Sequence, residues 1–393
     1  MRVDVVMPDA VADPKRPSGG NTYDRHIVAG LRGLGWEVRA HLTPGSWPDA
    51  GSEDRATLAA RLRTIPDGQL VLVDGLIGSA APEALVPEAD RLRLAILVHL
   101  PLGVEAEGGS TTNRAREYAA FAAARTIVAT STWTRAWLAA AYDLPAGRVA
   151  VVPPGVDPAH LTAPHELGNR LLCVGAVTPV KGQDVLVEAL ASILGLDWSC
   201  VCVGSTAISP GFAADVRRRA ADVRRRAAVL ACVPAGAAGA RRRPLGCGDV
   251  DARLTFTGPL VDAHVDARLT FTGPLVDADL DARFAAADLV IVPSRMETYG
   301  MVVTEALARG IPVVASDAGG LPETLGRTPG GDRPGLLVPP GDPVALAAAL
   351  RRWLADPAVR HTLRASARAR RATLRGWPDA ATELADVLAG VAA

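Results

Sequence analysis

Short apolar runs alternate along the whole chain with longer segments whose apolar residues have helical spacing. The runs are rich in Val, Ile and Leu and are bounded by Gly, Pro or polar residues, a pattern typical of strands buried on both faces of a parallel sheet. The predicted strands of the first half are residues 2–7, 37–42, 70–73, 92–99, 126–130 and 149–152. Those of the second half are residues 171–175, 198–203, a TFTG strand, 289–293, 312–315 and 335–338. Strands and helices in alternation predict an α/β fold.

The two halves repeat the same scheme, and at 393 residues the chain is long for one domain. We therefore expect two Rossmann-like, doubly wound domains that face a central cleft, with ligands at the carboxyl ends of the strands. Prolines and a glycine at 153–158, followed by the polar stretch 160–169, indicate the linker. The expected domains are residues 1–165 and 166–375, followed by a last helix within 376–393.

The second half contains two tandem duplications, which place a duplicated or inserted stretch at about 214–264. VDARLTFTGPLVDA occurs at 250–263 and again at 265–278, and ADVRRRA at 214–220 is repeated at 221–227. The seven-residue copy adds nearly two helical turns, so the helix face should survive. Only one TFTG can occupy a central strand position. We expect the second copy, Phe271 to Gly273, because the following helix and strand run on from it without interruption. The first copy should then be an extruded insertion.

Composition excludes several classes of protein. Acidic and basic residues balance at 42 each, so no global field favours nucleic acid. The chain starts directly on a strand pattern, and no uncharged apolar run approaches the roughly 18 residues of a membrane span, so we expect a cytoplasmic protein. The five cysteines form no CxxC pair, which favours reduced, buried thiols over a disulfide or zinc site.

Two weaker patterns have alternative interpretations. Asp249, Asp277 and Asp279 begin DxD sequences that could bind a metal ion, but aspartates before a helix are more often caps. The arginine triplets at 217–219, 224–226 and 241–243 could touch an anionic lipid surface, although a solvated helix face is the simpler interpretation. We expect no bound metal, and peripheral association with the inner membrane face stays open.

The segment PSRMETYGMVVTEALARG at 293–310 has the strongest chemical pattern in the chain. Glu297 and Glu305 lie eight positions apart across a predicted strand-to-helix junction. The helix should begin near Tyr299 and Gly300, where unsatisfied N–H groups and the positive end of the helix dipole favour an anion. An ionised glutamate only accepts hydrogen bonds, so beside such a site it is suited to sugar or ribose hydroxyls.

Lys181 carries an independent argument for phosphate binding. Lys15 and Lys181 are the only lysines, and the other 40 basic residues are arginines. Lys181 lies in a Pro-Val-Lys-Gly turn between a predicted strand and helix, where an ammonium group could reach a diphosphate. A surface lysine beside a helix is the alternative.

Several motifs in order resemble the retaining glycosyltransferases of the GT-B fold, family 4, also called glycosyl transferases group 1. Glu297 and Glu305 are similar to that family's EX7E pair. The other matching motifs are VGAVTPVKG at 174–182, SGGN at 18–21, VHLP at 98–101, STWTRAWL from 131 and VVPPGVD from 151. Many members carry an arginine directly after the strand glycine, where this chain has Ala176.

The resemblance implies retaining, metal-independent transfer of a sugar from a nucleoside diphosphate sugar to a hydroxyl acceptor, without a cofactor. The N-terminal domain would bind the acceptor, the C-terminal domain the donor, and the last helix would pack back on the first domain. Candidate catalytic residues are Glu297, His99 and Lys181. Candidate donor-binding residues are Glu305, Gly19, Gly20, Arg295, Thr298, Tyr299, Gly300 and Gly319.

Two alternatives remain at the level of sequence. One is a nucleotide-sugar-binding protein that has lost transfer, favoured by Ala176 and the duplications. The other is an epimerase or phosphorylase of similar architecture, which the EX7E segment disfavours. The donor base, the sugar and the acceptor, whether lipid or small molecule, are left open, because the acceptor loops at 8–25 and 101–112 have no readable pattern.

Overall fold

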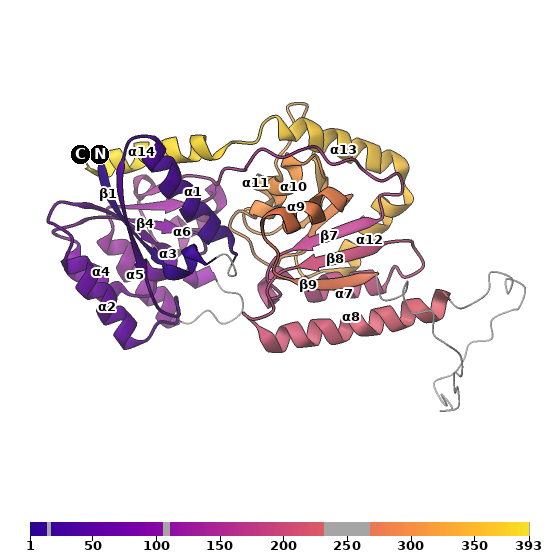
Figure 1. Ribbon diagram of the computed structural model, residues 1–393, viewed down its shortest axis with the longest axis horizontal. Coiled ribbons are helices and arrows are strands. Elements are labelled where there is room, and N and C mark those ends of the chain that lie inside the picture. Colours follow the sequence, from indigo (N-terminus) through magenta and orange to yellow (C-terminus); the bar gives the residue numbers. More distant parts are fainter. Residues whose placement is uncertain (14–16, 105–110, 232–267, 393) are drawn as a thin grey trace, which may run out of the picture.

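The computed structural model describes residues 1–13, 17–104, 111–231 and 268–392. It forms two α/β domains side by side, each built on a six-stranded sheet in which every pairing is parallel (Figure 1). The α/β class and the two doubly wound sheets expected from the sequence are confirmed.

The N-terminal sheet has the strand order β2-β1-β3-β4-β5-β6. Its strands are β1 (Arg2–Pro8), β2 (Glu37–Thr43), β3 (Leu70–Asp74), β4 (Arg93–Val98), β5 (Thr126–Ala129) and β6 (Val149–Val151). Its α-helices are α1 (Gly19–Gly33), α2 (Ser52–Arg63), α3 (Gly75–Gly78), α4 (Pro82–Leu85), α5 (Thr111–Ala123) and α6 (Thr132–Tyr142). Short 3-10 turns lie at η1 (Asp9–Ala12), η2 (Val86–Glu88), η3 (Leu102–Val104) and η4 (Ala146–Arg148).

The C-terminal sheet has the order β12-β11-β10-β7-β8-β9. Its strands are β7 (Arg170–Val174), β8 (Ser199–Val203), β9 (Leu269–Gly273), β10 (Leu289–Val292), β11 (Val313–Ser316) and β12 (Gly335–Val338). Its helical elements are η5 (Pro179–Lys181), α7 (Gln183–Ala191), α8 (Pro210–Ala231), α9 (Asp277–Ala286), α10 (Met301–Ala308), α11 (Leu321–Leu325), α12 (Pro343–Ala355) and α13 (Pro357–Arg371).

The near-continuous apolar strands arise because helices cover both faces of each sheet. In β3 every residue is buried. Val71 and Val73 face one apolar cluster, whereas Leu70 and Leu72 face the cluster on the opposite side. Alternate residues of one strand thus contribute to two cores, as the period of two along a strand requires.

The last helix, α14 (Trp377–Ala392), packs on the N-terminal domain beside α1 (Figure 1). Leu384 and Leu388 join the same apolar cluster as Ile27 and Leu31 of α1. The chain therefore crosses between the domains twice, once before β7 and once before α14.

The second TFTG copy forms β9, which pairs with β8. The expectation of a central position was wrong, because β9 lies at the edge of its sheet, where a strand needs only one partner. The first copy, at 250–263, and the insertion expected there lie outside the described residues. Both ADVRRRA copies belong to the single helix α8, and the duplication preserves its face: the buried positions Ala213, Val216, Ala220, Val223 and Ala227 recur at intervals of three and four.

The cysteines, the DxD aspartates and the membrane-spanning character of the helices can be compared with what the sequence predicted. Cys173, Cys200 and Cys202 are buried free thiols, while Cys232 and Cys247 lie outside the described residues. Asp277 and Asp279 occupy the first turn of α9 without a side-chain cap, so the cap expected there was wrong. In the described part of the chain, no helix combines the length and apolar character needed to cross a membrane.

Candidate active site

Apart from Glu305, which lies in α10, the predicted site residues lie in loops that follow β4, β7, β10 and β11, and at the start of α1. Parallel strands place their carboxyl ends at one edge of a sheet, so these loops gather where the two domains meet. Direct contacts cross this boundary. The Thr298 hydroxyl in the loop after β10 donates a 2.5 Å hydrogen bond to the His99 carbonyl after β4.

Lys181 and Glu297 form the contact at the centre of the donor-side loops. The Lys181 ammonium nitrogen lies 2.5 Å from Oε1 of Glu297, and the Ser294 hydroxyl donates to the same oxygen at 3.0 Å. The Lys181 side chain is 35% exposed and that of Glu297 12% exposed, so both can be reached by a ligand. The two motifs found separately in the sequence therefore meet in one ion pair.

Arg295 lies beside this pair, but its side chain contacts protein groups. Its guanidinium donates to both carboxylate oxygens of Asp184, at 2.8 and 2.7 Å, and to the carbonyl of Pro179 at 2.8 Å. Burial alone would raise the pKa of Asp184, yet the hydrogen bonds and charge of Arg295 lower it. The backbone N–H of Arg295 also donates to the Val180 carbonyl at 2.7 Å. Arg295 thus connects the Lys181 turn to the Glu297 loop.

The glutamate predicted to bind ribose, Glu305, lies in α10. Helix α10 begins at Met301, close to the start expected near Tyr299 and Gly300. Gly300 precedes it in the left-handed region, at φ 84°. Burial raises the pKa of Glu305 to about 7, although the nearby charge of Arg309 acts to lower it. Within the residues that the structure describes, the Glu305 carboxyl group accepts no hydrogen bond, so it is open to a ligand.

Gly319 supports the backbone of the Glu297 loop. Its φ is +57°, and a Cβ at this position would lie 1.9 Å from the carbonyl oxygen of Glu297. The neighbouring N–H of Gly320 donates to that same carbonyl at 2.8 Å. A larger residue at 319 would push the Glu297 loop away, so the geometry requires glycine for the close approach of two backbones.

Tyr299 contacts the linker between the domains. Its hydroxyl donates to the carbonyl of Pro154 at 3.3 Å, and burial raises its pKa to about 12. The side chain therefore holds the Glu297 loop against the linker in this structure.

His99 follows β4 directly and lies in a buried cluster with two carboxylates that sequence reasoning missed. Its Nε2 is 2.9 Å from Oδ1 of Asp24, on α1, and 3.4 Å from Oδ2 of Asp74, the last residue of β3. Gly20 lies against the ring, where its Cβ would be 3.1 Å from Cδ2, and Gly19 lies near Met301. The sequence carried one usable signal, since Asp74 ends an otherwise apolar strand whose carboxyl end faces the cleft.

The charges of this cluster follow from burial and proximity. Burial would lower the pKa of His99, but the charges of Asp24 and Asp74 and their hydrogen bonds raise it to about 10. Burial raises the pKa of Asp24 to about 7, against the opposing effect of His99. The three groups lie within 4.8 Å of one another, and among the described residues they form the one cluster that could hold a metal ion. An imidazolium has no free lone pair for a metal, so the cluster fits an ion-paired cation better.

Comparison with known proteins gives two family matches and several similar structures. Residues 76–160 match the family described as Glycosyltransferase Family 4, and residues 247–370 match the one described as Glycosyl transferases group 1. The sucrose-phosphate synthase of Thermosynechococcus elongatus superposes with a TM-score of 0.72 over 99% of this chain and 98% of that one, at 22% identity. The chain has the GT-B fold, and both matched segments are similar to glycosyltransferases. Anabaena HepE, solved with UDP and glucose, superposes with a TM-score of 0.70 at 18% identity, over 99% of this chain and 100% of HepE.

Curated glycosyltransferases align with this GT-B chain over different lengths. A D-inositol 3-phosphate glycosyltransferase from Streptosporangium roseum is 33% identical over 264 residues, 64% of this chain and 52% of its own length. The chain spans about half the length of this relative and of that from Jonesia denitrificans. A GDP-mannose-dependent alpha-(1-6)-phosphatidylinositol monomannoside mannosyltransferase from Mycobacterium tuberculosis is 28% identical over 419 residues, 96% of both chains.

Proposed function

We propose that the protein transfers a sugar from a nucleoside diphosphate sugar to a hydroxyl acceptor, with retention at the anomeric carbon and without a metal ion. The observation that carries this proposal is the Lys181–Glu297 ion pair between the loops after β7 and β10. A diphosphate needs a cation and a sugar needs acceptors for its hydroxyls, and this pair offers both in one place.

Lys181 stabilises the leaving diphosphate. A lysine ammonium has three N–H donors, and one of them is occupied by Glu297, so two remain for phosphate oxygens. Its positive charge offsets the negative charge that develops on the leaving oxygen. One preorganised donor of this kind contributes about 3 to 4 kcal/mol to lowering a barrier. The absence of an arginine at Ala176 increases the share that falls on Lys181 and on the start of α10.

The two glutamates bind hydroxyl groups. Glu297 accepts from sugar hydroxyls and favours the positive charge that develops at the anomeric carbon. Glu305, whose carboxyl group is unoccupied by protein donors in the described structure, accepts from the ribose hydroxyls. Closure of the two domains excludes water from the transferring sugar.

The names of the curated relatives suggest the acceptor class. D-inositol 3-phosphate and phosphatidylinositol monomannoside both carry a polyol ring with a phosphate group. We propose an acceptor of this chemistry, a cyclic polyol phosphate either free or in a lipid headgroup. GDP-mannose and the UDP-sugars are the donors to test first, because relatives and solved structures name GDP-mannose, UDP and UDP-glucose.

Donor hydrolysis and transfer with a panel of UDP, GDP, ADP and TDP sugars, in EDTA, test the proposal. We expect one donor to be cleaved, the product to keep the anomeric configuration of the donor by NMR, and Lys181→Ala to lose about 100-fold or more in kcat/KM. Lys181→Arg should recover part of the activity because it retains the charge. Activity that disappears in EDTA and returns with Mg²⁺ or Mn²⁺ would refute metal independence. Binding of a donor without turnover of any acceptor would instead indicate a binding protein.

A further inference from the structure

Two buried carboxylates from different elements approach the same nitrogen of His99. Asp24 lies on α1 and is 4% exposed, and Asp74 ends β3 and is also 4% exposed. The distances from Nε2 are 2.9 Å to Asp24 and 3.4 Å to Asp74. The cost of burying two carboxylates is recovered only if they are paired or hydrogen-bonded, and His99 is their shared partner.

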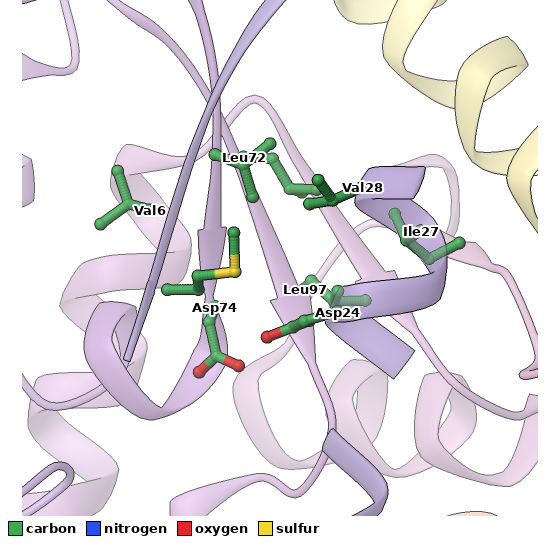
Figure 2. A pocket seen from close by; sticks show the side chains of 9 residues that line it. Val6, Asp24, Ile27, Val28, Leu72, Asp74 and Leu97 are labelled. Carbon is green, nitrogen blue, oxygen red and sulfur yellow. The ribbon is translucent and has the colours of Figure 1, made fainter. Parts of the chain in front are cut away.

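Each carboxylate is fixed in a different way. The second oxygen of Asp74, Oδ1, accepts from the backbone N–H of Leu76 at 2.6 Å, so the start of α3 orients this side chain. Asp24 is oriented by α1, and its Oδ2 has no protein partner among the described residues. Figure 2 shows both carboxyl groups at one end of a small cavity whose other walls are apolar, including Leu72, Val28 and Leu97. An apolar surrounding strengthens the attraction between the carboxylates and a cationic ring.

The ring itself cannot turn freely. Tyr23 packs against it edge-on at 5.2 Å between centroids, and the Tyr23 hydroxyl donates to the Val152 carbonyl at 2.9 Å. On another side, Gly20 leaves just enough space for the ring. Among the residues that the structure describes, Asp24, Asp74 and Tyr23 are the titratable groups that face His99 from the elements packed around it.

The other ring nitrogen, Nδ1, has no hydrogen-bond partner in the described part of the chain. The His99 side chain keeps 12% exposure, and the His99 carbonyl accepts from Thr298 of the donor-side loop. The ring therefore lies at the boundary between the domains. Its Nε2 is paired with protein carboxylates, and its Nδ1 is available to a ligand.

We propose that Asp24 and Asp74 are positioning residues, which hold the His99 imidazolium by Nε2 so that its Nδ1–H donates to an oxygen of the bound nucleotide sugar. This inference rests on the proposed sugar transfer. Its consequence is that the donor meets a fixed cation throughout the neutral pH range, whereas an unpaired histidine loses its charge near pH 6.5.

The charge of the ring can be measured without any donor. We would record the ¹⁵N and ¹³C signals of histidine rings between pH 5 and 10, and assign His99 by its loss in His99→Gln. We expect the wild-type ring to stay protonated beyond pH 8. In Asp24→Asn its titration midpoint should fall by about two pH units, because one neighbouring charge is removed. A wild-type midpoint near 6.5 would overturn the proposal.

The pH profile of activity separates positioning from a merely structural role. With the cleaved donor, kcat/KM of Asp24→Asn should approach the wild-type value near pH 5.5 and fall about fourfold below it at pH 8.5, since most of the rings have then lost their proton. Asp74→Asn should show the same direction, because asparagine retains the oxygen that accepts from Leu76. His99→Gln should be low at every pH. A uniform loss in Asp24→Asn, or no loss, would contradict the proposal.

The chain provides a matched control in a second buried pair. His41 Nε2 lies 2.7 Å from Oδ1 of Asp4, and this pair joins β2 to β1 inside the first sheet. Asp4→Asn removes a comparable buried charge, and we expect no change in the shape of the pH profile. If no donor is turned over by the wild type, the proposed function fails, while the NMR titration still decides whether Asp24 and Asp74 hold His99 as a cation.

Discussion

The guanidinium of Arg295 donates two hydrogen bonds, of 2.8 and 2.7 Å, to the two carboxylate oxygens of Asp184. Asp184 lies in the first turn of α7, immediately after the turn that contains Lys181. Arg295 lies in the loop after β10, which also contains Glu297. This two-point contact has the geometry in which arginine and carboxylate pair most strongly. It places the two loops that supply Lys181 and Glu297 in a fixed relation to each other.

The first prediction distinguishes a positioning role for Arg295 from direct donor binding. If Arg295 acts by holding the Lys181 turn, Arg295→Ala and Asp184→Asn should each lower kcat/KM about tenfold. The double variant should be little worse than either one, because both remove the same contact. Steady-state kinetics of the three variants measure this. If Asp184→Asn is active and Arg295→Ala is not, Arg295 binds the donor directly, as the sequence first suggested.

The second prediction concerns the pH dependence of donor binding through Glu305. Burial raises its pKa to about 7, and ribose hydroxyls are best bound by the ionised, acceptor-only form. Donor affinity should therefore rise with pH, by about tenfold from pH 6 to pH 8. Calorimetric titration of the donor in EDTA measures it. Glu305→Gln should bind more weakly and without this pH dependence, and an unchanged affinity would remove the ribose assignment.

The same residue makes a prediction for stability. Glu305 has a folded-state pKa above the ordinary value of 4.5, so the folded protein keeps a proton that the unfolded chain releases. The free energy of unfolding should fall as pH rises from 4.5 to 7, and the loss is complete above pH 7. Without donor, Glu305→Gln should therefore be more stable than the wild type by about 3 kcal/mol at pH 8 and nearly equal to it at pH 4.5. Thermal unfolding at the two pH values tests the sign.

Most of the strands could be predicted from sequence because they are buried on both faces and form uninterrupted apolar runs. The partly exposed strands β2 and β9 are exceptions. For β10, the expected 289–293 and the observed Leu289–Val292 differ by one residue. The edge position of β9 could not be predicted, because the short TFTG sequence does not indicate whether the strand has one neighbour in the sheet or two. Order within a sheet depends on long-range packing that a local pattern does not contain.

The candidate site was predictable only where chemistry and local spacing coincide. Glu297 and Glu305 share one strand-to-helix junction, so their proximity follows from a short segment. Asp24 and Asp74 are separated from His99 by 75 and 25 positions, and only the sheet order β1-β3-β4 brings them together. The carboxylate of Glu323, on α11, accepts a hydrogen bond from the backbone N–H of Thr132 at the start of α6 in the other domain, and no local sequence pattern predicts this contact.

Removal of the first long copy tests whether a single TFTG segment is enough for the fold. Because β9 at Leu269–Gly273 already completes the sheet beside β8, deletion of residues 250–264 should leave the fold intact. The deletion joins Asp249 directly to the second copy and retains its complete sequence. We expect the same circular dichroism spectrum and a cooperative thermal transition. The two deletion products would be almost identical in sequence, so the choice between the copies is tested by substitution in the full-length chain. Phe271→Asp, in β9, should lower the thermal transition because Phe271 packs against the apolar core. A loss of stability in Phe256→Asp and not in Phe271→Asp would show that the wrong copy was chosen.

Glu323 joins the two domains directly, and this contact predicts a role in closure. Its carboxylate accepts from the backbone N–H of Thr132 at 3.1 Å, from the N–H of Trp133 at 3.2 Å and from the Thr132 hydroxyl at 2.5 Å. These donors lie at the start of α6 in the N-terminal domain, whereas Glu323 belongs to α11 in the C-terminal domain. A negative charge at a helix N-terminus is favourable through unsatisfied N–H groups and the helix dipole.

Loss of this charge should favour a more open arrangement of the domains. We expect Glu323→Gln to raise the radius of gyration measured by solution scattering and to raise KM for the donor about three- to tenfold. The effect on kcat should be smaller, because the chemical step is unchanged once the domains close. Thr132→Val is the matched control, since it removes the hydroxyl but keeps both backbone donors and should have a milder effect. High salt should reduce the difference between wild type and Glu323→Gln, because Glu323 is exposed and its charge is screened. Equal scattering curves and equal KM for the two proteins would show that the contact does not hold the domains together.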